Sequence, residues 1–76
     1  MKELIKYIAQ SLVDDPEQVT VEEIEGSSSS ILELKVAKED MGKIIGKKGK
    51  TAQAMRLILS AASAKLKKRT VLEIIE

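Results

Sequence analysis

The sequence predicts an α+β domain in which a three-stranded mixed sheet carries three helices on one face. Segments of helical and strand periodicity follow one another along the 76 residues in the order helix, strand, strand, helix, helix, strand. The first two strands are close enough in sequence to form a hairpin. The third strand follows a helical crossover over residues 38–68, and such a crossover returns the chain parallel to the strand it left. A chain of this length predicts one domain, 1–76.

The first helix is expected over residues 2–13, where apolar residues recur at helical spacing. These residues are Leu4, Ile5, Ile8 and Leu12. The helix should end at Asp15, because a residue that precedes a proline is disfavoured in the α region. Tyr7 is the single aromatic residue. A packing role in the core or at its edge is favoured for it over stacking on a base.

Two strands are expected next, over residues 17–25 and 31–37. Val19 and Val21 alternate with polar residues, but Ile24 breaks the alternation, which predicts a bulge or strand end near residues 22–23. Gly26 and the serines 27–30 predict a turn or loop. Without a histidine to activate one of these serines, a nucleophilic role is not favoured.

A short helix over residues 39–45, a long helix over 51–67 and a last strand over 69–75 complete the order. The long helix carries an apolar stripe that should face the sheet. The stripe consists of Ala52, Met55, Leu59, Ala62 and Leu66, widened by Leu57 and Ile58. Alternation predicts that the inward strand residues are Leu32, Leu34, Val36, Leu72 and Ile74.

The connection between the last two helices has the composition of an anion site. Gly46 and Gly49 bracket two lysines, and glycine reaches positive φ at no steric cost. Thr51 is placed to cap the helix that follows, whose first N–H groups and positive dipole end suit an anion. Further lysines lie close by in the sequence. The segment therefore predicts capture of a phosphate, with a helical corner bearing solvated lysines as the plainer alternative.

Two similar motifs do not fit as well. A P-loop requires a glycine five residues before the Gly-Lys-Thr of positions 49–51, and that position holds Ile44. A DNA-reading helix-turn-helix would place the helix from Thr51 onward in the major groove, but the flanking strands argue against it. Gly42 is unfavourable inside a helix by ~1 kcal/mol relative to alanine. Its presence predicts a close approach to the backbone there, either by a ligand or by another helix.

Composition excludes several classes of function. The chain contains no cysteine and no histidine, so we expect neither catalysis nor a bound metal or cofactor. Residues 1–40 hold four lysines and ten acidic residues, whereas residues 41–76 hold nine basic and two acidic residues. This asymmetry indicates one basic surface for a polyanionic partner. The absence of a long apolar run or a signal peptide predicts a cytoplasmic protein without a membrane span.

The element order and the Ile-Ile-Gly-Lys-Lys-Gly segment resemble the KH motif. The additional helix and strand at the N-terminus resemble the type II arrangement of the motif. In length, in DDPEQVTVEEIE, in MGKIIGKKGKTAQAMRLIL and in the closing strand, the chain is similar to the small bacterial single-KH RNA-binding proteins of the KhpA type. This resemblance covers the whole chain.

The resemblance implies a clamp on about four nucleotides of single-stranded RNA with low sequence specificity. The implied RNA-binding residues are Gly42, Lys43, Ile44, Ile45, Gly46, Lys47, Lys48, Gly49, Lys50 and Arg56. In this arrangement the Gly46–Gly49 turn faces the sugar–phosphate backbone, and Gly42, Ile44 and Ile45 form an apolar floor under the bases. Strand 31–37 and loop 26–30 are expected to form the opposite wall.

The resemblance also implies a role and partners. The role is that of a post-transcriptional regulator or RNA chaperone, and the partners are a second copy of the chain and a second bacterial KH protein of the Jag type, linked to control of cell elongation. The alternative is a protein-interaction module with secondary nucleic-acid binding. Alternation places Ile31, Val71 and Ile75 on the outer sheet face, which favours a weak homodimer. The sequence leaves open which RNA is bound, and whether single-stranded DNA also binds.

Overall fold

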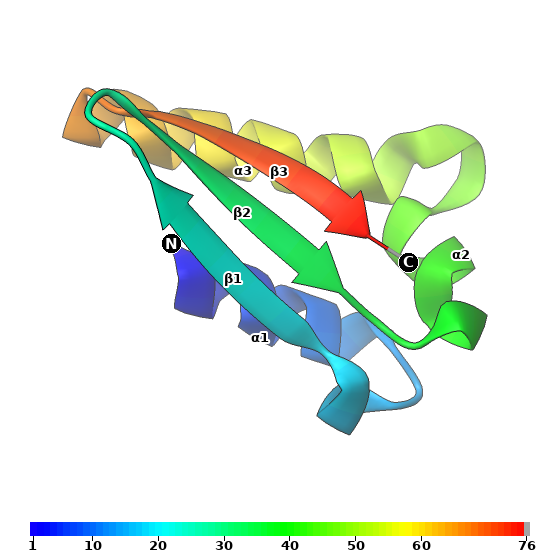
Figure 1. Ribbon diagram of the computed structural model, residues 1–76. Coiled ribbons are helices and arrows are strands. Elements are labelled where there is room, and N and C mark those ends of the chain that lie inside the picture. The colour runs from blue at the N-terminus through cyan, green and yellow to red at the C-terminus, as the bar shows by residue number, and fades with distance from the viewer. Residues whose placement is uncertain (76) are drawn as a thin grey trace.

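The computed structural model describes residues 1–75 and has the predicted order of elements (Figure 1). The helices are α1 (Lys2–Leu12), α2 (Met41–Ile45) and α3 (Lys50–Leu66), and the strands are β1 (Thr20–Glu25), β2 (Ser29–Lys35) and β3 (Arg69–Ile75). Single turns of 3-10 helix cover Pro16–Gln18, Lys38–Asp40 and Lys47–Gly49. In the described part of the chain, no helix has the length and apolar character needed to cross a membrane.

The three strands form one mixed sheet in the order β1-β2-β3. β1 pairs antiparallel with β2, and β2 pairs parallel with β3, with Leu32 opposite Leu72. The parallel pairing predicted from the crossover is therefore confirmed. Because β2 is central, β3 forms one edge of the sheet.

The helices cover one face of the sheet, and the core lies between the two layers (Figure 1). The core consists of Ile5, Ala9, Val19, Val21, Leu32, Leu34, Val36, Ile44, Met55, Leu59 and Leu72. Four of the five predicted inward strand residues are buried, and the fifth, Ile74, is partly buried against this cluster. The predicted fold class, α+β with three helices on one face of a mixed sheet, is confirmed.

The first two strands differ from the prediction in their bounds. β1 begins only at Thr20, because Pro16 begins a 3-10 turn that occupies the preceding residues. The predicted bulge is wrong, since pairing runs unbroken from Thr20 opposite Lys35 to Glu25 opposite Ser30. Ile24 keeps the regular alternation and simply points to the outer face, opposite Ile31. The last two serines of the predicted loop belong to β2.

Two helical stripes also differ from the prediction. In α1, Ala9 is buried together with Ile5, whereas Leu4 and Leu12 lie at the exposed margins of the stripe. In α3, the buried residues are Ala52, Met55, Leu59 and Ser63. Leu57 and Leu66 are 71% and 65% exposed, so their predicted core role is wrong. The packing role favoured for Tyr7 is also wrong, because its side chain is 71% exposed.

Candidate nucleic-acid interface

The Gly46–Gly49 turn links α2 to α3 through three residues of positive φ. Gly46 has φ 77°, Lys48 has φ 57° and Gly49 has φ 75°. The Gly46 N–H donates to the carbonyl of Gly42 at 2.8 Å, and the Gly49 N–H donates to the carbonyl of Gly46 at 3.1 Å. The left-handed conformation at both glycines is the one that only glycine adopts without strain. The sequence therefore uses glycine where the turn requires it.

Thr51 has a different role from the one predicted. α3 begins at Lys50, its capping position is Gly49 in the left-handed region, and no side chain caps it. Thr51 lies in the first helical turn and packs against Gly46, where a Cβ atom would meet the Thr51 hydroxyl and lie 2.8 Å from its backbone nitrogen. The predicted cap is wrong because the glycine turn already sets the helix start, and the threonine closes the turn from inside.

Lys47, Lys48 and Lys50 surround this turn and are all exposed. Within residues 1–75, no acidic group lies within ion-pair distance of these three ammonium groups. They stand at the N-terminal end of the 17-residue helix α3, where the helix dipole is positive. As far as residues 1–75 are concerned, the turn is therefore a concentrated positive site on the surface with no acidic side chain paired to it.

Gly42 lies on the exposed side of α2, and a Cβ atom built on it would meet nothing within 4 Å. Close packing of another helix, one of the two predicted reasons for this glycine, is therefore absent from the described residues. A Cβ at Gly49 would also point into open space. Both glycines leave backbone accessible to a ligand.

A groove of about 370 Å³ adjoins the turn. It is lined by Met41, Ile45, Gly49, Ala52, Gln53, Arg56 and Ile74. α2 and the first turns of α3 supply one side, and the C-terminal part of the edge strand β3 supplies the other through Ile74. The lining combines aliphatic side chains with one amide and one guanidinium group, which suits a base with its adjoining phosphate.

The opposite wall is not the one predicted. β2 is the central strand, so the edge strand β3 borders the groove. The β1–β2 turn lies at the far end of the molecule, where the Arg69 N–H donates to the carbonyl of Ser28 at 3.3 Å (Figure 1). Arg69 follows the C-terminus of α3, whereas the glycine turn precedes its N-terminus. The serine loop is therefore separated from the glycine turn by the length of α3, about 25 Å.

The structure places the ten predicted site residues in three groups. Ile45, Gly49 and Arg56 line the groove. Gly42 lies in α2, Gly46, Lys47 and Lys48 belong to the turn that follows, and Lys50 begins α3. Ile44 is fully buried in the core and is not among the residues that line the groove, and Lys43 is held in ion pairs. Sequence reasoning missed Met41, Ala52, Gln53 and Ile74, although the spacing of Gly49, Gln53 and Arg56 places them on one helical face.

Lys43 belongs to a network at the start of α2. Its ammonium group lies 2.7 Å from Asp14 and 3.4 Å from Asp40. The Asp40 carboxylate is 2% exposed and also accepts the N–H groups of Asp14 and Asp15 at 3.1 and 3.2 Å. The hydrogen bond from the Asp14 N–H, followed by that from Asp15, lowers the pKa of Asp40, and the Asp14 side chain raises the pKa of Lys43.

Comparison with known protein families agrees with the resemblance predicted from the sequence. Residues 2–74 match the family model described as KhpA/KhpB, KH domain. The chain belongs to the KhpA/KhpB KH-domain family. The predicted resemblance is thereby confirmed. Over the described residues, no group of three or more acidic side chains is arranged to hold a metal ion.

Relatives from several bacteria carry the name RNA-binding protein KhpA. The protein of Caldanaerobacter subterraneus subsp. tengcongensis is 59% identical over 99% of this chain and 100% of its own length. The protein of Clostridium acetobutylicum is 57% identical with the same coverage. A crystal structure of an Aquifex aeolicus Era variant bound to GDP and AlF4⁻ shares the fold with TM-score 0.62 and 21% identity, over 96% of this chain and 28% of that one.

Proposed function

We propose that this protein binds single-stranded RNA, with the Gly46–Gly49 turn on the sugar–phosphate backbone and the bases in the adjoining groove. The observation that carries the proposal is the turn itself. Its lysines have no acidic partner within residues 1–75, and its left-handed glycines leave the backbone open beside an aliphatic groove. The relatives named RNA-binding protein KhpA support RNA as the ligand.

The groove accommodates a short segment, and about four nucleotides is the length that a KH domain holds. Ile45 and Ile74 offer aliphatic contact to the bases, Gln53 offers an amide to a base edge, and Arg56 offers a guanidinium to a phosphate or base. A single side-chain amide, that of Gln53, can distinguish few bases, so the specificity for RNA sequence is low. The function is a binding one, as a post-transcriptional regulator or RNA chaperone, without catalysis.

The test is the double substitution Lys47→Asp with Lys48→Asp. Both side chains are exposed, so the substitution removes no packing, but it places two negative charges beside a phosphate. Binding of a labelled single-stranded RNA, followed by fluorescence anisotropy, should fall by at least about a hundredfold. The slope of log K on log salt for the wild-type protein should be roughly −3, as expected for four contacts to a single strand.

Lys2→Asp with Lys35→Asp is the matched control, because both lysines are exposed and lie outside the groove. This variant should bind RNA within about threefold of the wild-type protein. Circular dichroism establishes that each variant is folded, and unlabelled single-stranded DNA as competitor tests the preference for RNA. Wild-type affinity in the folded Lys47/Lys48 variant would remove the turn from the binding site.

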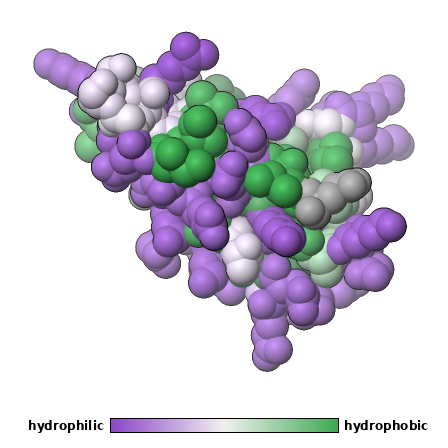
Figure 2. Space-filling view, in the orientation of Figure 1, coloured by the Kyte–Doolittle hydropathy of each residue, from purple (hydrophilic) through white to green (hydrophobic). Residues whose placement is uncertain are grey.

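A second candidate function is protein association through the outer face of the sheet. The register places Ile24, Ile31 and Val71 side by side across the three strands. Ile24 is 52% and Val71 37% exposed, and Figure 2 shows apolar side chains among polar ones on this face. A second copy of the chain, or a second KH protein of the Jag type, is the proposed partner. Sedimentation equilibrium of the wild-type protein against Ile31→Lys tests the homodimer, which the substitution should disrupt.

A further inference from the structure

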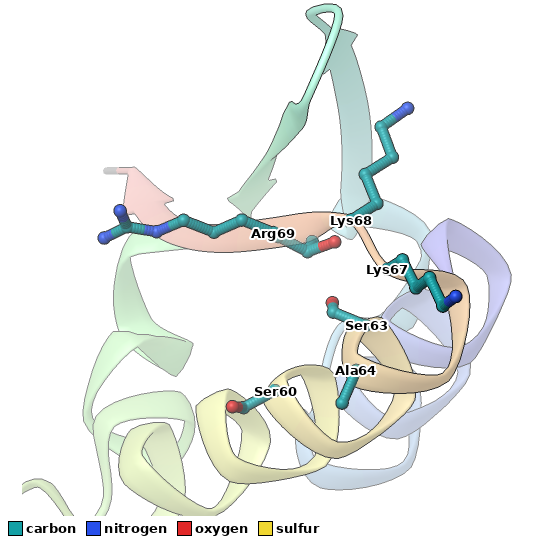
Figure 3. A pocket seen from close by; sticks show the side chains of 7 residues that line it. Ser60, Ser63, Ala64, Lys67, Lys68 and Arg69 are labelled. Atoms are coloured by element: carbon teal, nitrogen blue, oxygen red, sulfur yellow. The ribbon is translucent and has the colours of Figure 1, made fainter.

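A second hollow, of about 410 Å³, lies between the C-terminal end of α3 and the start of β3. Its polar lining consists of Ser60, Ser63, Lys67, Lys68, Arg69 and Thr70. Figure 3 shows Ser60 and Ser63 on α3, with the Ser63 hydroxyl directed toward β3, and Lys67 and Lys68 extending from the rim. Neither the groove described above nor the glycine turn includes these residues.

Hydroxyl groups in this hollow lack strong partners. Among the described residues, the one hydrogen-bond partner of the Ser63 hydroxyl is the Met1 sulfur, at 3.8 Å. The Thr70 hydroxyl is buried without a partner, as is the hydroxyl of Ser30, the residue opposite Thr70 in the parallel register. Buried hydroxyls without partners are uncommon because each loses its hydrogen bonds to water. Hydroxyl donors surrounded by cations form the set of groups that binds phosphate oxygens.

Charge at this site is also largely unneutralised. Lys68 lies 3.6 Å from Glu25, but Lys67 and Arg69 have no acidic partner within ion-pair distance in the described residues. The negative end of the α3 dipole lies here and opposes an anion. That effect is reduced, because the Lys67 N–H caps the carbonyl of Ala64 at 3.3 Å and the Lys68 N–H caps that of Ser63 at 3.1 Å.

The hollow and the groove lie along the same seam, which is the boundary between one face of α3 and the edge strand β3. Gln53, Arg56, Ser60, Ala64 and Lys67 follow one another at intervals of three or four residues, so they occupy one face of α3. β3 runs beside that face as an edge strand, with Ile74 in the groove and Thr70 in the hollow. An RNA strand that leaves the groove between α3 and β3 can therefore reach Lys67 while it stays on the polar face of α3.

We propose that this hollow is a second phosphate site, which holds the backbone of the same RNA strand beyond the nucleotides bound in the groove. The proposal rests on the RNA-binding function proposed above and extends its footprint along α3. Lys67 and Arg69 attract the phosphate, and the hydroxyls of Ser60 and Ser63, which line the hollow, donate to its oxygens.

The test compares oligouridines of about four and about twelve nucleotides by fluorescence anisotropy. The variant is Lys67→Asn with Arg69→Gln. Lys67 has φ 55°, a conformation that asparagine tolerates, and Lys68 is retained because of its ion pair with Glu25. The matched control, Lys2→Gln with Lys35→Gln, removes the same charge from surfaces outside the seam.

We expect the wild-type protein to bind the longer RNA more tightly than the shorter one. The hollow variant should lose about tenfold in affinity for the longer RNA and about 1.4 units of its salt slope, as for two lost contacts, and should bind the shorter RNA unchanged. An unchanged affinity for the longer RNA would overturn the proposal, as would an equal loss for both lengths or an equal loss in the control.

Two further outcomes separate this proposal from the function on which it rests. If the wild-type protein binds the short RNA but gains nothing from the longer one, the groove stands and the second site falls. If neither RNA binds, both proposals fall. Inorganic phosphate, titrated while the amide resonances of Ser60 and Thr70 are followed by NMR, identifies the ligand further: saturation by phosphate without any effect of RNA length would overturn the assignment to RNA.

Discussion

The two ends of α2 differ in how completely their polar groups are paired. At the N-terminal end, the Asp40 carboxylate is buried and accepts two backbone N–H groups and the Lys43 ammonium, which also pairs with Asp14. Just beyond the C-terminal end, seven and eight residues after Asp40, Lys47 and Lys48 are exposed and have no acidic partner in the described residues. A single short helix therefore joins a closed network to an open turn.

This difference explains how an exposed turn keeps its shape. A surface loop with few contacts of its own is normally mobile. In this chain, α2 is fixed at its start to the segment after α1 by the Asp40 hydrogen bonds, and the side chain of Ile44 is buried in the core. The turn is held at its base, so the lysines at its tip need no structural contact and remain available to a ligand.

The comparison also separates two lysines that the sequence presents as equivalent. Lys43 and Lys47 lie four residues apart in the same basic segment. The structure pairs Lys43 with Asp14 and Asp40, whereas Lys47 faces solvent. Substitution of Lys43 should therefore act mainly on folding, and substitution of Lys47 mainly on binding.

The largest effect on stability is predicted for Asp40→Ala. The substitution leaves the N–H groups of Asp14 and Asp15 without their acceptor and removes one partner of Lys43. Unpaired polar groups with little exposure are destabilising. Urea denaturation should show a larger loss of unfolding free energy than for any glycine substitution described below. Lys47→Asp with Lys48→Asp, the control at the open end, should unfold at the wild-type urea concentration.

The dependence of stability on pH provides an independent check on the network around Asp40. Because the folded-state pKa of Asp40 lies below its ordinary value of 3.8, the carboxylate stabilises the fold fully above that value. The contribution is lost as the pH falls through the folded pKa. The stability difference between the wild-type protein and Asp40→Asn should therefore be constant from pH 7 to about 5 and shrink below about 4. A difference that persists unchanged into strong acid would exclude the Asp40 charge as its source.

Sequence reasoning predicted the elements and their topology because these depend on local patterns. Alternation in residues 31–37, the helical period of 51–67 and the crossover between them determine the mixed sheet. The glycine turn was also predictable, since Gly46 and Gly49 adopt the conformation that favours glycine. In each case, the residues that carry the signal are close together in the chain.

Contacts between distant segments were not predictable in the same way. The network joins Asp40 to residues 25 and 26 positions earlier, and nothing in either segment indicates the pairing. The groove wall at Ile74 depends on which strand lies at the sheet edge. Leu57 and Leu66 were predicted as core residues but are exposed. A periodic stripe shows which face of a helix is apolar, but it does not show how much of that face the sheet covers.

The next effect in size concerns the two left-handed glycines of the open turn. Gly46→Ala should lose about 2–3 kcal/mol of unfolding free energy, because positive φ is strained for alanine and its Cβ would meet Thr51. Gly49→Ala should lose about 1 kcal/mol, because Gly49 has φ 75° and ψ 12°, a left-handed helical conformation that costs alanine less than the φ 77° and ψ 171° of Gly46, and because the added Cβ would lie in open space. Urea denaturation of both variants checks the difference, and equal losses would contradict the larger combined cost of backbone strain and Thr51 contact expected at Gly46.

The smallest effect on stability, and the one of opposite sign, is predicted for Gly42→Ala. Gly42 lies within α2, and alanine is favoured over glycine in a helix by about 0.5–1 kcal/mol. A Cβ there would meet nothing within 4 Å, so no packing opposes that gain. The variant should therefore be slightly more stable than the wild-type protein in urea.

The same variant tests whether the open space above Gly42 belongs to the ligand. If an RNA strand approaches this backbone, the added methyl group should weaken binding about tenfold in the anisotropy assay even though the protein is more stable. Ala61→Gly, on an exposed position of α3 outside the groove, is the reciprocal control. It should lose about 1 kcal/mol of stability and bind the short RNA as the wild-type protein does. If Gly42→Ala is more stable but binds RNA with wild-type affinity, the RNA does not approach the backbone of α2. Its contacts at this end of the helix would then be limited to the Gly46–Gly49 turn.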